Sequence, residues 1–76
     1  MAIINHITRG DNGEQIKGKI DYSGSPAAFV VERIPDGVPF RCFRDGTEIS
    51  KDVDSMLQEC GEFTIAEYPG GGSVGK

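Results

Sequence analysis

The chain has no tryptophan, one histidine and two cysteines among its 76 residues, and it contains no long apolar run. A membrane-spanning helix needs about 20 consecutive apolar residues, so we expect no membrane association. The first residues lack the basic and then apolar layout of a signal peptide, which favours a cytoplasmic location. A chain of this length forms one small domain that buries only about 60% of its unfolded surface, so its core must be compact.

Basic residues are also few, because 8 Lys and Arg stand against 12 Asp and Glu, for a net charge of −4. Proteins that bind nucleic acid use Lys and Arg to displace counterions from phosphates. The charge balance therefore argues against nucleic-acid binding. An acidic surface fits docking onto a basic partner.

The residues that usually carry metal or catalytic chemistry are scattered. His6, Cys42 and Cys60 are too few and too widely spaced for a zinc site, which needs about four clustered ligands. Both cysteines are expected to be reduced and buried, as free cysteine commonly is. His6 has no Ser or Cys nucleophile with a recognisable signature, and the acidic residues are typical of solvated turns and helix ends. We expect no metal, no cofactor and no catalytic residue, so the chain is not predicted to be an enzyme.

Apolar alternation predicts a hairpin at the start of the chain. Residues 2–8 are rich in β-branched side chains, and residues 15–22 alternate apolar and polar side chains. The Asn12-Gly13 pair between them is typical of a tight hairpin turn. Gly18 would weaken the second strand or mark a bulge.

Three further strands are predicted in the second half. Residues 38–50 indicate a strand, a turn at Asp45-Gly46 and a short strand. Residues 62–68 indicate a final strand that places Phe63 and Ile65 on one face.

Residues 25–34 are consistent with a helix or a buried strand, and the helix is favoured. Ser25 is a suitable N-cap and Pro26 suits the first helical position. Helical spacing groups four apolar residues on one predicted face: Ala27, Val30, Val31 and Ile34.

A second short helix is predicted over residues 50–61, with Ser50 as its cap and Gly61 as its terminator. Helical spacing again predicts a buried stripe, made of Val53, Met56, Leu57 and Cys60.

The last residues, 70–76, match the spacing of a phosphate-binding loop. Such a loop presents backbone N–H groups at the start of a following helix, and it carries a Ser or Thr after the Lys. Neither follows Lys76 in this sequence, so we expect no nucleotide binding there.

From residue 40 to residue 71 the chain predicts a strand, a turn, a short helix and then the sequence GEFTIAEYPGG. This region resembles the C-terminal half of the β-grasp sulfur carriers, namely the small subunit of molybdopterin synthase and the carrier of the thiazole pathway. The resemblance implies an α+β fold, a β-grasp-like mixed sheet of four to five strands with one main helix and a second short helix. It implies a domain over residues 1–69 and a flexible glycine-rich tail over residues 70–76.

The resemblance also implies a non-enzymatic, ubiquitin-like module that acts by protein–protein contact. Its functional tail would be Gly70 and Gly71, or Gly71 and Gly72, whose terminal carboxylate an activating enzyme adenylates before it becomes a thiocarboxylate. In this sequence residues 72–76 or 73–76 follow the functional glycine pair, so a carrier would need to lose them. The alternative is a phage or viral assembly protein whose tail is inert or becomes ordered on its assembly partner. The oligomeric state is not predicted.

Overall fold

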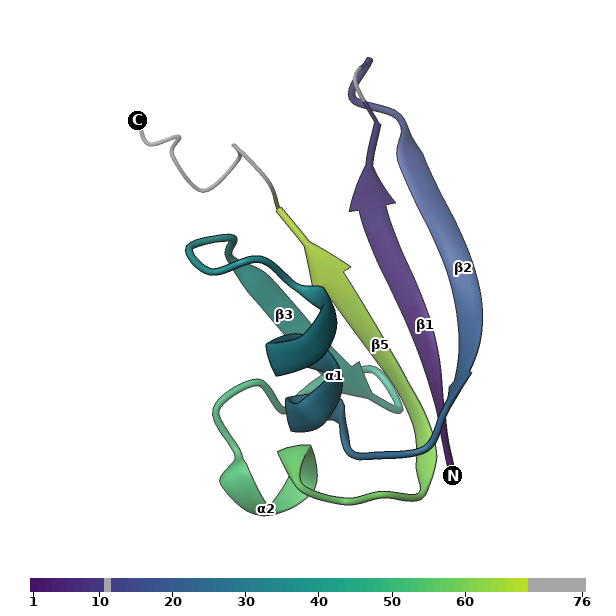
Figure 1. Ribbon diagram of the computed structural model, residues 1–76, viewed down its shortest axis with the longest axis vertical. Helices are drawn as coiled ribbons and strands as arrows, with labels where there is room; N and C mark the ends of the chain where they lie inside the picture. The colour runs from purple at the N-terminus through teal and green to yellow at the C-terminus, as the bar shows by residue number, and fades with distance from the viewer. Residues whose placement is uncertain (11, 69–76) are drawn as a thin grey trace.

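A five-stranded mixed sheet with a helix across one face organises the chain (Figure 1). The computed structural model describes residues 1–10 and 12–68. The elements are β1 (Ala2–Arg9), β2 (Gln15–Tyr22), α1 (Pro26–Arg33), β3 (Phe40–Arg44), β4 (Thr47–Glu48), α2 (Val53–Met56) and β5 (Gly61–Glu67).

The strands lie in the order β2-β1-β5-β3-β4. The central pair, β1 and β5, is parallel, and the other neighbouring pairs are antiparallel. This is the predicted α+β, β-grasp-like sheet, with one main helix and a second short one. The predicted tail and its glycines lie outside the described residues.

The first hairpin turns where the sequence predicts it. The N–H of Gly10 donates to the carbonyl of Glu14 at 2.8 Å, and the N–H of Gly13 donates to the carbonyl of Gly10 at 2.9 Å. Gly13 has φ of 81°, a conformation that glycine adopts without steric cost. The register of β1 and β2 is unbroken, with Gly18 directly opposite His6, so Gly18 does not mark a bulge.

Residues 25–34 contain a helix, as favoured from the sequence. The Ser25 side chain accepts a hydrogen bond from the N–H of Ala28 at 3.2 Å, and Pro26 occupies the first turn. The predicted buried face is partly wrong, because Phe29 is fully buried whereas Val31 is 85% exposed. In this helix of 8 residues, the Phe29 ring lies on the side that faces the sheet. Val31, two residues further along, therefore lies on the opposite side.

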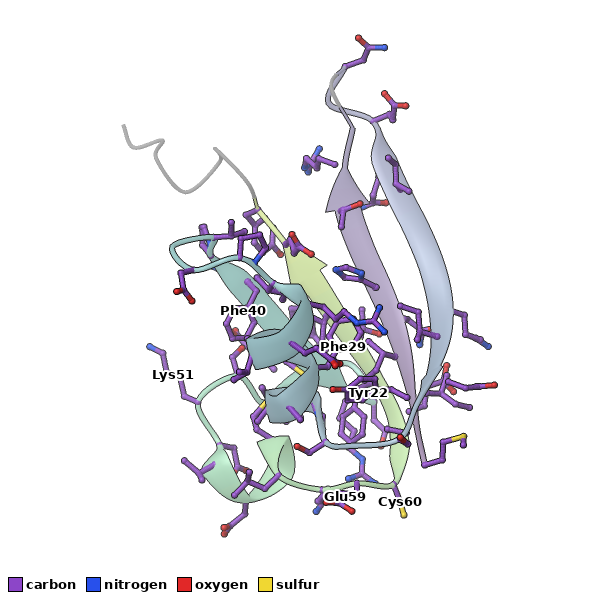
Figure 2. All side chains as sticks on the ribbon, viewed as in Figure 1. Tyr22, Phe29, Phe40, Lys51, Glu59 and Cys60 are labelled. Carbon is purple, nitrogen blue, oxygen red and sulfur yellow. The ribbon has the colours of Figure 1, made fainter. Side chains whose placement is uncertain are left out.

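The core lies between the helices and one face of the sheet (Figure 2). The ring of Phe29 meets the ring of Tyr22 edge to face at 5.2 Å and that of His6 at 5.1 Å. The buried core residues are Ala2, Ile4, Phe29, Ile34, Cys42, Ile49, Met56, Phe63 and Ile65.

The second helix, α2, has 4 residues and differs from its prediction. Asp52 caps it through a hydrogen bond from the N–H of Ser55, whereas the predicted cap, Ser50, instead accepts from the N–H of Cys42 at 3.1 Å. A single turn directs only one large side chain, that of Met56, into the core. The other members of the predicted stripe are exposed: Val53, Leu57 and Cys60.

The two cysteines therefore differ, and only Cys42 is buried as predicted. Cys60 lies at the end of the sheet where β5 begins (Figure 2). Burial raises the pKa of the Cys42 thiol from 9.0 to about 11.

We predict that an alkylating reagent at neutral pH modifies Cys60 rapidly and Cys42 only after unfolding. The thiolate is the reactive species, and burial both raises the pKa of the Cys42 thiol and shields it from the reagent. Mass spectrometry of timed samples should show one added group on the native protein and two in denaturant. With Cys60→Ser, the rapid modification should disappear, and a rapid reaction that persists in this variant would contradict the burial of Cys42.

Candidate functional site: the open face of the sheet

The face of the sheet opposite α1 is covered by neither helix of the described part of the chain. Phe29 of α1 and Met56 of α2 belong to the same core, so both helices lie on the other side. Successive side chains of a strand point to opposite faces, and the residues between the core positions therefore form what we call the open face: Ile3, Asn5, Ile7, Gln15, Lys17, Lys19, Asp21, Arg41, Phe43, Glu62, Thr64 and Ala66.

Strand register aligns the middle of the open face into two rows that run across four strands. One row contains Lys17, Ile7, Ala66 and Arg41. The other contains Lys19, Asn5, Thr64 and Phe43. Each row thus begins with a lysine on the edge strand β2 and continues over small, apolar or neutral polar residues, and the first row ends at Arg41 on β3.

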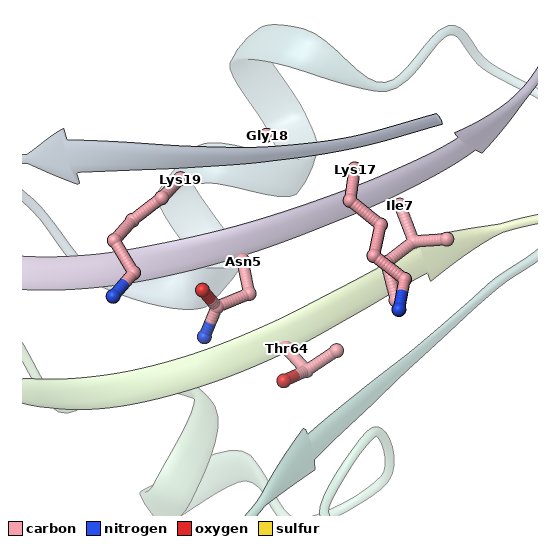
Figure 3. A pocket seen from close by; sticks show the side chains of 6 residues that line it. All are labelled: Asn5, Ile7, Lys17, Gly18, Lys19 and Thr64. Carbon is pink, nitrogen blue, oxygen red and sulfur yellow. The ribbon is translucent and has the colours of Figure 1, made fainter. Parts of the chain in front are cut away.

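A shallow hollow of about 450 Å³ lies at the β2 end of these rows (Figure 3). In the view of Figure 3, the Lys17 and Lys19 side chains extend from β2 over β1, and Thr64 lies beyond them on β5. The lining residues are Asn5, Ile7, Lys17, Gly18, Lys19 and Thr64. The hollow combines two cationic groups with hydrogen-bonding side chains and one apolar surface, which is a suitable composition for a polypeptide ligand.

The charge of the two rows differs from that of the whole chain. Lys17, Lys19 and Arg41 are their charged residues, although the net charge of the protein is −4. Within residues 1–10 and 12–68, the two ion pairs join other groups, so no carboxylate lies within 4.0 Å of these cations. The Arg41 guanidinium lies 5.8 Å from the centre of the Tyr68 ring. The two rows therefore form a basic band on an acidic protein, and Asp21 and Glu62 lie beside this band on the open face.

His6 lies on the helix side of the sheet and not on the open face. Its Nε2 pairs with the Glu67 carboxylate, and its ring contacts Phe29. The His6 and Glu67 side chains are 20% and 11% exposed, so the pair ties β1 to the end of β5 in a partly buried setting. Among the described residues, no group of three His, Cys, Asp or Glu side chains could hold a metal ion.

The predicted carrier residues, Gly70, Gly71 and Gly72, lie outside the described residues. Sequence reasoning assigned no role to the open face. Lys17 and Lys19 alternate with apolar residues in the predicted second strand, and this pattern already places them on one face. Their neighbours from β1, β5 and β3 could be named only once the strand order was known.

In comparisons with known proteins, no family model matches this chain and no curated protein matches it significantly. Neither helix in the described ranges has the length and apolar character needed to cross a bilayer.

Proposed function

We propose that the chain is a non-enzymatic, ubiquitin-like module of the cytoplasm that acts by protein–protein contact through the open face. The observation that carries this proposal is the open face itself, whose basic band and hollow lie opposite the helices. The cations there contact no carboxylate of the described chain. A partner that supplies complementary groups would gain both charge attraction and buried apolar surface.

The experiment compares two glutamate substitutions that lie on opposite sides of the molecule. Ile7→Glu places a carboxylate in the centre of the open face, where a bound partner would have to desolvate it at a cost in free energy. Val31→Glu makes the same chemical change on α1, where the side chain is 85% exposed. Partners would be captured by chemical crosslinking in the native host and quantified by mass spectrometry. We expect Ile7→Glu to reduce the crosslinked partner at least about tenfold and Val31→Glu to leave it unchanged.

The reverse result would assign the contact to a different surface. Val31 lines an apolar hollow of about 210 Å³ that also includes Val30, Ile34, Val38 and Phe40. If Val31→Glu alone abolishes the crosslink, the partner binds beside α1 and the open face is not the interface. Circular dichroism of both variants controls for folding.

The sharper form of this proposal is a sulfur carrier, and one observation favours it. The N–H of Tyr68 donates to the carbonyl of Pro39 at 2.9 Å, so the chain is held against the sheet directly before Pro69 and the glycines. A glycine tail leaving a fixed point can enter a narrow active site because its residues have no side chains. In this form the open face docks on the activating enzyme, and Gly71 or Gly72 becomes the terminal residue.

Intact mass of the protein from its native host tests the carrier form separately. A carrier should lose the residues after Gly71 or Gly72, so the mature mass should lack residues 72–76 or 73–76. If the mature chain retains Lys76, the carrier form fails, and the chain is an interaction or assembly module such as those of phage particles.

A further inference from the structure

The sheet has one long edge that no other strand covers in the described part of the chain. β2, with 8 residues, is the outermost strand on one side (Figure 1). On the other side the outermost strand is β4, with 2 residues. A strand at an edge presents unpaired N–H and C=O groups that can bind another extended segment. Only β2 is long enough to offer a run of such groups.

The hairpin fixes which backbone groups of β2 point to this edge. The hydrogen bond from Gly10 to Glu14 makes that pair a hydrogen-bonded one. Hydrogen-bonded pairs alternate along an antiparallel ladder, so Gly18 is bonded to His6 in the same register. The N–H and C=O groups of Lys17 and Lys19 consequently point away from β1, toward the open edge.

The two sides of this edge differ in polarity. On the open face it carries Lys17 and Lys19 in its middle and Asp21 near its end. On the helix side it carries Ile16, which is 48% exposed, and Ile20, which is partly buried against the core. Between these isoleucines, a Cβ added to Gly18 would meet no atom within 4 Å. An added strand would therefore have lysines beside one of its faces and an apolar surface with free space beside the other.

The lysines also argue against a second copy of this chain paired about residues 17–19. Antiparallel pairing of two β2 strands centred on residues 17–19 would place lysine opposite lysine. Like charges directly opposite each other destabilise a strand pair, whereas opposite charges stabilise it. Around residues 17–19 the edge is thus unsuited to self-pairing and complementary to an acidic strand. A second copy shifted so that Lys19 faces Asp21 is left as an outcome of the sedimentation experiment below.

We propose that β2 binds an extended segment of a partner protein as a sixth strand, and that this segment alternates acidic and apolar residues. Its carboxylates lie on the open face beside Lys17 and Lys19, and its apolar side chains lie over Ile16, Gly18 and Ile20. This inference rests on the proposed function of protein contact and specifies the chemistry of the partner. Lysines on an edge strand also serve simply to block aggregation, and that role alone predicts no peptide binding.

The experiment uses a synthetic peptide as long as β2, with alternating glutamate and valine and with blocked ends. Titration into the full chain would be followed by NMR of backbone amides. On binding, exchange of the Lys17 and Lys19 amide protons should slow at least about tenfold, because they enter new hydrogen bonds. The Gly18 amide, which is already bonded to β1, should change much less. Shifts confined to other elements, or uniform protection of β2 without this alternation, would overturn the proposal.

Two controls test the charge and the site. A peptide with glutamine in place of glutamate, and the double variant Lys17→Gln, Lys19→Gln, should each weaken binding about fivefold or more, since exposed ion pairs contribute modestly. Lys51→Gln, a matched change on an exposed lysine away from β2, should leave the affinity unchanged. Equal binding of both peptides, or equal weakening by Lys51→Gln, would contradict an acidic strand on this edge.

The result of the peptide titration can be separated from the result of the crosslinking experiment that tests the proposed function. If the peptide fails to bind β2 while Ile7→Glu still abolishes the partner crosslink, the open face is the interface and the sixth strand is wrong. If the peptide binds but Ile7→Glu leaves the crosslink intact, the open face is not the interface. Sedimentation should show a monomer at all concentrations tested, and a dimer that the double lysine variant alters would replace the acidic partner with a second copy.

Discussion

Replacing Phe29 with alanine is expected to lower the free energy of unfolding by about 3–5 kcal/mol. Phe29 is the large side chain that α1 places in the core, and none of its surface is exposed. Its ring meets Tyr22 and His6 edge to face and lies 5.8 Å from the Arg33 guanidinium. Alanine would remove these contacts and leave a cavity between the helix and the sheet.

The effect should be large relative to the whole stability of the domain. A chain of 76 residues is expected to be stable by roughly 4–11 kcal/mol. Phe29→Ala should therefore leave a substantial unfolded population even without denaturant if the total lies at the low end. Urea unfolding followed by circular dichroism measures the change.

Val31→Ala on the same helix is the matched control, because its side chain is 85% exposed. Its cost should stay within about 0.5 kcal/mol, apart from the small difference in helix propensity. Equal losses for the two variants would mean that the face of α1 that contacts the sheet is not the one described above.

Replacing Gly61 with alanine is expected to destabilise the fold by about 1–3 kcal/mol. Gly61 has φ of 119°, which side chains other than that of glycine rarely adopt. It starts β5 opposite Ala2, so it sets the register of the central parallel pair. An added Cβ would also lie 3.4 Å from the Arg44 guanidinium and 3.6 Å from the Phe63 ring.

The matched change Gly18→Ala should have the opposite sign. Gly18 lies inside β2 without a positive φ, and an added Cβ meets nothing within 4 Å. Glycine inside a strand costs about 0.5–1 kcal/mol relative to alanine, so this variant should gain up to that amount. The urea midpoints of unfolding of the two variants measure both effects, provided that their m-values equal that of the unmodified protein. A neutral Gly61→Ala would show that β5 can begin in an ordinary conformation.

Local sequence signals predicted the strands and turns because each depends on adjacent residues. The Asn12-Gly13 turn, the Asp45-Gly46 turn and the alternation of β5 all have local causes, and all are confirmed. The cap at Ser25 likewise decided between helix and strand for residues 25–34. Such signals act within a few residues, so they are visible without the fold.

The buried faces of the helices were less predictable. Apolar spacing is ambiguous in short helices, where two overlapping sets of residues fit one period. In α1, Phe29 is buried and Val31 is exposed. In the second predicted helix, Met56 is buried, whereas Cys60, which lies beyond the end of α2, is exposed. Which set is buried depends on the shape of the sheet beneath, and that shape is set by residues far along the chain.

The candidate site was hidden for the same reason. The pair Lys17 and Lys19 is readable from alternation, but its relation to Thr64 and Arg41 depends on the strand order. The overall charge indicated a basic partner, whereas the local charge of the two rows in the middle of the open face favours an acidic one. Net charge averages over surfaces that face different directions.

The parallel pairing of β1 with β5 has a consequence for how the protein reaches this structure. The neighbouring inner strands β1 and β5 are the first and the last strand of the described chain, with Ala2 opposite Gly61. Their contact closes a loop of almost the whole described chain. Closing so long a loop costs conformational entropy, which must be lost before the contact can form. Proteins dominated by distant strand pairs fold in milliseconds to seconds, whereas helical bundles fold faster. Before β5 pairs with β1, the hairpin and α1 lack the core side chains that β5 supplies, Phe63 and Ile65. We therefore expect folding to complete in one late, cooperative step.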